Sequence, residues 1–296
     1  MIFYKRLSEL TMEETVALWN KGFEGYFVNI ELSMEKFLAR SVGEGLSLEH
    51  SLAAYEEGHP HPVGIVMNGF RVLEGKKVAW NGGTGIAPDY RGKGIGKLLM
   101  ERNLQLYREQ GVDIALLEAI LQNERAIKLY QSIGYRVTEN LVGMQHTGIL
   151  DAGQLQPTFP HRYAMTRGLP PEVRNLPFYR YFSAWQTQWA SMKDGESLII
   201  SDGNEAVGYA LFKRVFGEDG GLATIALYQC EAMPGRTDTA EILKAALREV
   251  YAPSALSIKR LAVNIRASNK ELIDLLSGLG FASYVEQVHM ELVVQI

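Results

Sequence analysis

The first half of the chain alternates between strand-like and helix-like patterns of hydrophobic and polar residues. Short apolar runs bounded by turn residues predict strands at 51–55, 63–67, 78–87 and 114–117. Apolar residues at helical spacing predict helices at 12–19 and 124–132, and a third helix on the stripe Ile95, Leu98, Leu99 and Leu106. This order of segments is typical of a mixed α/β fold.

Residues at the ends of these helices support their boundaries. Thr11 offers a polar cap just before the first helix, and Asn123 does the same before the last one. Gly134 is expected to end the last helix, and Gly111 to end the helix that carries the third stripe. The sequence therefore predicts one end of each of the first two helices and both ends of the last one.

A fixed offset of 146 positions relates the two halves of the chain, because residues of the same kind then coincide without a gap. The coincident pairs are Pro88 with Pro234, Asn123 with Asn269, Gly134 with Gly280, Tyr135 with Phe281, Leu52 with Leu198, and Met144 with Met290. They keep register across strand-like and helix-like segments alike. The sequence therefore predicts two copies of one fold, residues 1–150 and 151–296, joined near 151–154.

The second half repeats the order of elements in the first. Strands are expected at 197–201, 206–212, 224–230 and 260–265, and a helix at 239–250. The predicted fold class is therefore α/β of the α+β kind, with a mixed sheet flanked by helices in each of two tandem domains.

Composition and charge exclude several classes of protein. The chain is 47% hydrophobic and 22% charged, which is typical of a globular protein rather than a disordered, fibrous or membrane protein. A net charge of -4 gives no electrostatic reason to bind nucleic acid, and no apolar run is long enough to span a membrane. The N-terminal residues do not resemble a secretion signal, and Cys230 is the only cysteine. A reducing cytoplasm is therefore the expected location.

Three glycines alternate with other residues in the loop Arg91-Gly92-Lys93-Gly94-Ile95-Gly96, directly before a predicted helix. Glycine lets the backbone approach a ligand closely, and unpaired N–H groups at a helix N-terminus attract anions. Arg91, Lys93 and Lys97 add positive charge. The loop is therefore expected to bind a pyrophosphate group, with an ordinary tight turn as the alternative.

Two common nucleotide-binding motifs fit this loop poorly. A phosphate-binding loop of the NTPase type has Ser or Thr after its Gly-Lys pair, whereas Gly96-Lys97 is followed by Leu98. The dinucleotide fingerprint spaces its last glycine one residue further on and usually lies in the first βαβ unit. Neither of these two motifs therefore describes the loop well.

Two segments of the first half resemble motifs of the GNAT superfamily of acetyl-CoA-dependent acyltransferases. Residues 86–99 resemble its pyrophosphate motif, and residues 123–130 followed by Gly134-Tyr135 resemble its second motif at the expected distance. The resemblance covers about the first 150 residues. It implies a mostly antiparallel sheet whose two middle strands splay apart, and an acetyl-CoA site formed by Ile86, Ala87, Arg91, Gly92, Lys93, Gly94, Gly96, Lys97, Asn123 and Tyr130.

The resemblance also implies roles in acetyl transfer for two side chains. Glu118 precedes Tyr130 by twelve residues, which resembles the spacing of base and acid in GNATs that acetylate protein N-termini. Glu118 is expected to take the proton of the amine, directly or through water, and Tyr130 to protonate the departing thiolate. The backbone N–H near Ile86 is expected to stabilise the thioester oxyanion. The alternatives are a solvated or salt-bridged glutamate and a packing tyrosine.

Other candidate residues carry less specific signals. Glu24 and Tyr26 follow the first helix, where GNATs place acceptor-binding loops, and they are candidates for contact with the acceptor. His59 and His61 flank a proline without a third ligand nearby, so no metal site is expected. Cys230 belongs to the second copy and is expected to be an inert buried thiol.

The second copy lacks the residues that would carry this chemistry. Under the same offset the glycine loop corresponds to 237–242, which has no glycine and two carboxylates. The two catalytic candidates correspond to Asn264 and Leu276. The second copy is therefore expected to be degenerate, to support the first copy, and to bind no cofactor.

These features predict an N-acetyltransferase that moves an acetyl group from acetyl-CoA to a primary amine of a small molecule or a peptide. The alternatives are a non-catalytic acetyl-CoA sensor and an acyltransferase that uses a longer acyl-CoA. Neither nucleic acid nor a membrane is expected as a partner. The tandem organisation also resembles that of the mycothiol synthase family, which does not by itself identify the acceptor.

Overall fold

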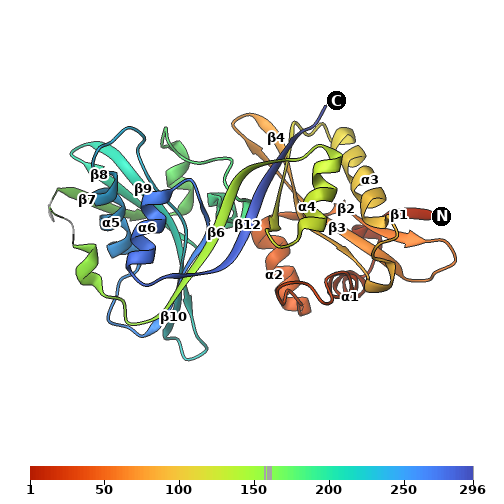
Figure 1. The fold of residues 1–296 in the computed structure, drawn as a ribbon, viewed down its shortest axis with the longest axis horizontal. Helices are drawn as coiled ribbons and strands as arrows, with labels where there is room; N and C mark the ends of the chain where they lie inside the picture. The colour runs from red at the N-terminus through yellow and green to blue at the C-terminus, as the bar shows by residue number, and fades with distance from the viewer. Residues whose placement is uncertain (157, 159–161, 296) are drawn as a thin grey trace. The chain divides into compact units, whose positions relative to one another are not determined.

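The computed structural model describes residues 1–156, 158 and 162–295, and the chain divides into two compact units (Figure 1). The first unit comprises Met1–Thr138 together with Val288–Ile296, and the second comprises Glu139–Gln287. Each unit has a β-sheet and its own hydrophobic core. The tandem α/β fold predicted from the sequence is therefore confirmed.

The sheet of the first unit has the strand order β1-β2-β3-β4-β5-β12. The strands are β1 (Ile2–Arg6), β2 (Leu46–Glu56), β3 (Pro62–Leu73), β4 (Lys76–Ile86), β5 (Ile114–Ile120) and the part of β12 (Ala282–Val293) that begins at Val288. Neighbours from β1 to β4 are antiparallel, whereas β4 and β5 are parallel. A parallel pair needs a crossover connection, and a helix after the glycine loop provides it.

The helices of the first unit begin and end at residues suited to those places. They are α1 (Met12–Gly22), α2 (Met34–Glu44), α3 (Ile95–Glu109) and α4 (Glu124–Ile133), with the short 3-10 helices η1 (Leu7–Glu9) and η2 (Pro88–Tyr90). The Thr11 hydroxyl accepts the N–H of Glu14, and the Asn123 side chain accepts the N–H of Ala126, so both predicted caps are confirmed. Gly134 ends α4 with φ 111°, a conformation that favours glycine.

Two apolar clusters cover opposite faces of this sheet. Along β2, Leu52 and Ala54 point into a cluster with α3 and α4, whereas Ala53 and Tyr55 point into a cluster with α1 and α2. In Figure 1 the two helix pairs lie on opposite sides of β2 and β3. The sheet of the first unit is therefore buried between two helical layers.

The parallel pairing of β4 with β5 covers only the first part of β4. It runs from Val78 opposite Ile114 to Asn81 opposite Leu117. Among the described residues, no further pairing between these two strands follows. The two middle strands therefore part where the resemblance placed a gap.

A β-bulge in β4 lies at the point where the two strands part. Gly82 is an extra residue in β4 relative to β3. The bulge returns Thr84 to the face of Asn81, whose Nδ2 lies 2.8 Å from the Thr84 hydroxyl. Both side chains also lie within 3.4 Å of the sulfur of Met100 on α3. The bulge therefore keeps the end of β4 turned towards α3.

The second unit repeats this layout with the strand order β12-β6-β11-β10-β9-β8-β7. Its strands are β7 (Tyr163–Gly168), β8 (Glu196–Asp202), β9 (Glu205–Phe216), β10 (Leu222–Ala232), β11 (Ile258–Arg266), the part of β6 (Arg136–Gly148) from Glu139 on, and the first part of β12. Its helices are α5 (Thr239–Val250), α6 (Lys270–Gly278), η3 (Ala152–Leu155), η4 (Pro170–Asn175), η5 (Trp185–Thr187) and η6 (Trp189–Ser191). β10 and β11 are parallel, as β4 and β5 are in the first unit.

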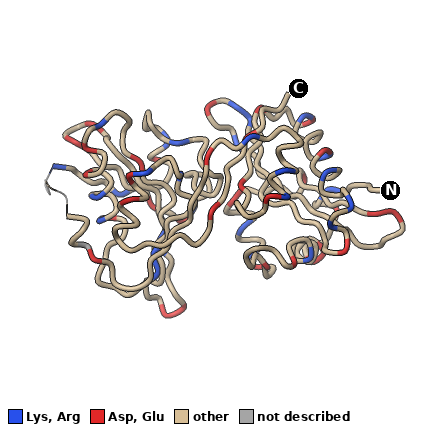
Figure 2. The backbone as a smooth tube through the Cα atoms, in the orientation of Figure 1, with Lys and Arg blue, Asp and Glu red and all other residues tan. Residues whose placement is uncertain are grey.

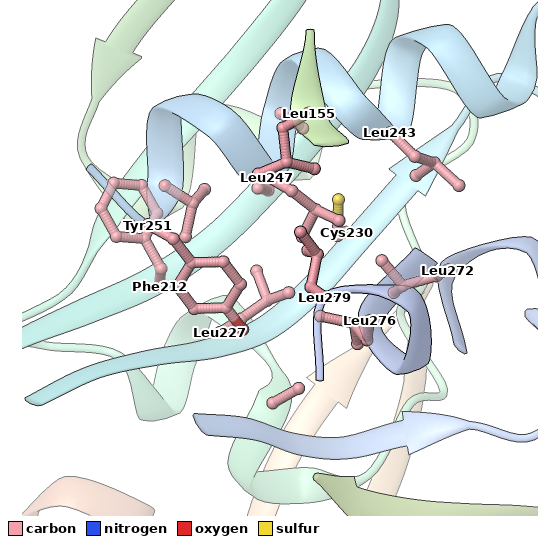
Figure 3. Packing of buried hydrophobic residues seen from close by; sticks show 14 of the residues in the cluster. Leu155, Phe212, Leu227, Cys230, Leu243, Leu247, Tyr251, Leu272, Leu276 and Leu279 are labelled. Atoms are coloured by element: carbon pink, nitrogen blue, oxygen red, sulfur yellow. The ribbon is translucent and has the colours of Figure 1, made fainter. Parts of the chain in front are cut away.

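The core of the second unit is built from leucines of α5 and α6 packed on β9 and β10 (Figure 3). Cys230 on β10 is 1% exposed and lies among these leucines. Burial raises the pKa of its thiol well above the ordinary range, so the thiol stays protonated at neutral pH. Such a thiol is a poor nucleophile, as expected for a packing residue.

The last strand of the chain is divided between the two units, and its second part belongs to the first unit. A division at residue 150 places all of β12 in the second domain, but Val288, Met290 and Val294 lie in the core of the first unit. Conversely, Met144 and Leu150 lie in the core of the second unit. The compact units therefore differ from the ranges 1–150 and 151–296, because sheet partners, and not position along the chain, decide where a strand packs.

Candidate active site

A cavity of about 330 Å³ opens in the first unit beside the N-terminus of α3. Its walls come from the end of α1 and the loop after it, the end of β4, the glycine loop and the start of α4. The predicted cofactor-binding residues that line it are Ile86, Arg91, Gly92, Gly94, Gly96, Lys97, Asn123 and Tyr130. The structure therefore brings the two sequence motifs together around one cavity.

The glycine loop adopts a backbone that glycine favours. Gly92 and Gly94 have φ of 84° and 83°, and Gly94 caps the N-terminus of α3. A β-carbon on Gly94 would meet no atom within 4 Å, so the space in front of the helix is open. The first N–H groups of a helix have no partner within the helix, and the helix dipole is positive there. This open N-terminus suits a pyrophosphate group in size and charge.

Cationic side chains on the first turns of α3 and α4 also line the cavity. They are Lys97 and Arg125. Nη2 of Arg125 lies 3.7 Å from the position that a β-carbon on Gly92 would take, so its guanidinium stands next to the glycine loop. Arg125 is absent from the predicted site residues, although its place two residues after the Asn123 cap was a visible signal.

The guanidinium of Arg91 binds backbone carbonyls. Its Nε donates to the oxygen of Ile86 at 2.9 Å, and its Nη2 donates to the oxygens of Gly22 and Glu24 at 3.1 and 2.7 Å. Arg91 therefore ties the loop after α1 to the glycine loop and shapes the cavity wall. Lys93 is not among the residues that line the cavity. Its ammonium lies 5.0 Å from the centre of the Tyr90 ring.

The backbone at the end of β4 offers a donor towards the gap. The N–H of Ala87 donates to the oxygen of Val63 on β3 at 3.0 Å. Because successive N–H groups of a strand point to opposite edges, the N–H of Ile86 points to the edge that faces β5. Ile86 lines the cavity and Ala87 does not. The N–H of Ile86 therefore points towards the gap, where the resemblance places an oxyanion donor.

Of the three tyrosines that line the cavity, Tyr90 lies in η2, whereas Tyr130 on α4 and Tyr26 in the loop after α1 are candidate site residues. Burial raises the pKa of Tyr130 to about 12, and a hydrogen bond with Thr84 opposes part of this rise. Burial also raises the pKa of Tyr26, against a hydrogen bond with Asn123. Both phenols therefore carry their protons at neutral pH. Tyr26, a candidate for contact with the acceptor, lies beside the candidate cofactor residues.

Glu118 is buried and lies outside the residues that line the cavity. Its side chain is 5% exposed, its Oε2 accepts the indole N–H of Trp80 at 2.7 Å, and its Oε1 lies 3.0 Å from Nδ1 of His289. The neighbouring Leu117 belongs to the core beside α3, so Glu118 points to the face that carries α1 and α2. Tyr130 belongs to the core beside α3. The two catalytic candidates therefore lie on opposite faces of the sheet.

Glu24 is not among the residues that line the cavity. Its side chain is 58% exposed and pairs with Nζ of Lys21 at 2.9 Å, which lowers the pKa of the Glu24 carboxyl. It lines a separate hollow of about 520 Å³ in the loop after α1. Tyr26 lines both hollows, so it is the candidate for acceptor contact that the cavity brings closest to Tyr130.

Metal and membrane features are absent from the described part of the chain. No group of three or more His, Cys, Asp or Glu side chains is placed there to hold a metal ion, and no helix there is long and apolar enough to cross a membrane. His59 contacts Glu56 and Tyr90 instead. Positive and negative residues are interspersed along the chain (Figure 2).

Comparison with known proteins assigns the N-terminal segment to a family. The model of the Acetyltransferase (GNAT) family matches residues 5–135, which include the glycine loop, β5 and α4. This segment is a GNAT acetyltransferase domain. The mycothiol acetyltransferase of Corynebacterium aurimucosum is 38% identical over 56 residues, which are 19% of this chain and 18% of that protein. The match therefore spans less than a fifth of this curated relative.

Solved structures extend the GNAT fold to the whole chain. A tandem GNAT protein from the clavulanic acid biosynthesis pathway has a TM-score of 0.61 at 14% identity, covering 100% of this chain and 99% of that one. A GCN5-related N-acetyltransferase from Sphaerobacter thermophilus has a TM-score of 0.66 at 14% identity, covering 100% and 96%. At such low identity these likenesses show the fold alone, and the fold is a tandem GNAT fold.

In the second GNAT-like copy an ion cluster takes the place of the glycine loop. The carboxylate of Asp238 accepts hydrogen bonds from Arg236 and from the Tyr163 hydroxyl, each at 2.8 Å, and Arg162 lies 2.9 Å away. Arg236 above all holds the pKa of Asp238 well below its ordinary range. Ile242, at the counterpart of the last loop glycine, is fully buried in the core. Where the first copy has glycines, the second copy therefore has an ionised carboxylate paired with arginine and an isoleucine side chain buried in the core.

Proposed function

We propose that the chain is an N-acetyltransferase that transfers an acetyl group from acetyl-CoA to a primary amine of a small molecule or peptide, by direct attack of the amine. The observation that carries this proposal is the cavity that joins the glycine loop at the start of α3 to Tyr130 on α4. The GNAT match over residues 5–135 supports acetyl-CoA as the donor, since this family generally uses it.

The residues around the cavity suit the pyrophosphate of the donor. The N–H groups at the start of α3 and the open space before Gly94 would hold it, with Lys97 and Arg125 adding positive charge. When bound, acetyl-CoA supplies the acetyl group as a thioester and a thiol as the leaving group. Arg91 acts indirectly in this proposal, because its guanidinium holds the loop that forms the opposite wall.

Glu118 is assigned the proton of the amine, and Tyr130 is assigned a hydrogen bond to the leaving sulfur. The amine nitrogen forms a bond to the acetyl carbon while the bond from that carbon to sulfur breaks, so the amine loses one proton and the sulfur gains one. Glu118 receives the proton of the amine, directly or through water. A pKa of about 12 for Tyr130 lies above that of an ordinary thiol, near 8.5, so Tyr130 stabilises the leaving thiolate by donating a hydrogen bond, and the thiolate takes its proton from water.

The main chain of β4 supplies the remaining interaction. The N–H of Ile86 points to the gap between β4 and β5, where it would stabilise negative charge on the acetyl oxygen. A fixed backbone donor needs no rearrangement during the reaction. Most of the acceleration is expected from holding amine and thioester together in one site, for which effective concentrations are large.

A thiol-release assay with a panel of amines tests this proposal. The purified chain is mixed with acetyl-CoA and with small primary amines, amino sugars and short peptides, and with the same compounds N-acetylated beforehand as controls. The proposal expects free thiol and acetylated product in equal amounts with at least one primary amine and none with its blocked control. Tight acetyl-CoA binding without thiol release across the panel would favour a sensor, and faster release from a longer acyl-CoA would favour a different acyl donor.

A further inference from the structure

Three polar side chains from neighbouring strands meet on the face of the first unit's sheet that carries α1 and α2. They are Trp80 on β4, Glu118 on β5 and His289 on β12. Their strand neighbours belong to the core beside α3, namely Ala79, Leu117 and Val288. Strand alternation therefore turns all three polar side chains to the other face. His289 has no part in the proposed reaction so far.

The carboxylate of Glu118 is held by two ring N–H groups. Trp80 can only donate, and its Nε1 lies 2.7 Å from Oε2. Nδ1 of His289 lies 3.0 Å from Oε1, and both side chains of this pair are nearly buried, at 4% and 5% exposed. A buried carboxylate needs donors to remain an anion. These two contacts fix both oxygens and the rotamer of Glu118.

The surroundings of Nε2, the other ring nitrogen of His289, indicate where the protons of this pair lie. Nε2 is buried and has no hydrogen-bond partner among the described residues. If Glu118 carried the shared proton, or if His289 were an imidazolium, Nε2 would bear a buried N–H without an acceptor, which is rare and costly. If Nδ1 carries the proton, only a lone pair at Nε2 is unpartnered. The fitting arrangement is a neutral His289 protonated at Nδ1 beside an ionised Glu118.

We infer that His289 is a positioning residue for acetyl transfer, which orients the carboxylate of Glu118 at the point where β4 and β5 part. This inference rests on the proposed function, in which Glu118 receives the proton of the amine. The distance in sequence between the two residues is 171 positions, and β12 brings His289 next to β5. The last strand of the chain thereby contributes to the site of the first GNAT domain.

Nitrogen NMR of the histidine rings in the full chain, without donor or acceptor, tests the pairing itself. The His289 signal is assigned by its loss in His289→Leu. At pH 7 the expected form is the neutral tautomer protonated at Nδ1, and Glu118→Leu, which removes the acceptor, should change that tautomer. Protonation at Nε2, or an imidazolium at pH 7, would contradict the inference even if the enzyme transfers acetyl groups.

Kinetics of two substitutions at the same position test the positioning role. His289→Asn keeps an N–H donor close to the place of Nδ1, whereas His289→Leu removes it. His289→Leu should lower kcat by about tenfold or more with little change in acetyl-CoA affinity, and His289→Asn should restore most of it. Equal losses in both variants, or full kcat in His289→Leu, would overturn the role.

A double-mutant cycle separates positioning from a general loss of structure. In a Glu118→Gln background, His289→Leu should cost little further kcat, because the carboxylate it orients is gone. The matched control is His146→Leu in the second unit, since Nδ1 of His146 is also buried without a partner among the described residues. This control should keep kcat. If the wild-type chain releases no thiol while the NMR result is as expected, the proposed function fails and the pairing stands.

Discussion

The two segments at equivalent places of the repeat, residues 91–96 and 237–242, each run into the first turn of a helix, α3 or α5, and differ in their chemistry. The first contains glycines with positive φ and opens on a cavity. The second contains Asp238, whose carboxylate is bound by Arg236 and the Tyr163 hydroxyl. The helix is kept in both copies because the core needs it. The glycines are kept in one copy, and no packing contact at Gly94 explains them.

This difference separates residues that packing requires from residues that a ligand requires. Ile242 fills the core where the first copy has a loop glycine, and Leu276 is buried where the first copy has Tyr130. Both replacements are apolar and suit a core. The second copy therefore has the fold without the loop glycines and the tyrosine of the first copy, so the fold alone does not require these residues.

The largest effect is expected from Gly94→Val in the first loop. Gly94 has φ 83°, which β-branched residues rarely adopt, and the new side chain would enter the open space in front of α3. Affinity for acetyl-CoA should fall by about 100-fold or more, which corresponds to about 2.7 kcal/mol. Isothermal titration calorimetry measures it.

Gly111→Val is the matched control, because Gly111 follows the same helix with φ 62° and open space around it, away from the cavity. It should lower stability through backbone strain and keep acetyl-CoA affinity. If both variants bind acetyl-CoA like the wild type, the pyrophosphate assignment is wrong. If both lose binding equally, backbone strain and not phosphate contact explains the loss.

The parts of the fold that could be predicted from the sequence are those that depend on local residues. The Thr11 and Asn123 caps, and strands with strong apolar runs, need only their neighbours. The sequence did not predict helix α2 (Met34–Glu44). Among its described residues Phe37 alone is buried, so the helix has only a weak apolar stripe. The place of β12 depends on sheet partners far away in the chain, so the division at 150 could not anticipate it.

The candidate site, too, combines residues from short local motifs with contacts between residues far apart in the sequence. The glycine loop and the Asn123 cap lie within two short motifs, and the cavity unites them. The contacts of Arg91 with the carbonyls of Gly22 and Glu24, and of Glu118 with His289, join residues far apart in sequence. No local pattern reveals such contacts. Charge alone suggested that Arg91 would bind phosphate, whereas the fold also offers it carbonyl oxygens.

The next largest effect is expected from Tyr130→Phe, which gives the first copy an apolar side chain where the second has Leu276. The change removes the hydroxyl that would stabilise the leaving sulfur, so kcat should fall by about 100-fold while acetyl-CoA affinity changes by less than about threefold. Steady-state kinetics and calorimetry measure the two quantities. Tyr107→Phe is the control, since Tyr107 is equally buried but donates to Asn68, away from the cavity. Full kcat in Tyr130→Phe would remove Tyr130 from the mechanism.

A smaller effect is expected from Asp238→Asn in the second loop. Because Arg236 lowers the pKa of Asp238, the ionised carboxylate stabilises the fold above the ordinary Asp range, and this contribution is lost as pH falls. At pH 7 the variant should melt about 3 °C lower than the wild type, and the difference should shrink below about pH 4. Asp274→Asn, at an exposed site on α6, should change little. A difference that grows towards low pH would contradict the role of the ion cluster.

The stoichiometry of acetyl-CoA binding tests most directly the claim that one copy of the fold binds the cofactor and the other does not. At the equivalent place of the second copy, Arg236 is bound to the carboxylate of Asp238 and Ile242 fills the core, so the positive charge and the space that a pyrophosphate group needs are already taken. Calorimetric titration of the purified full chain should therefore give one site per chain, and Gly94→Val should abolish it. Two tight sites per chain, or one site that survives Gly94→Val unchanged, would contradict the assignment.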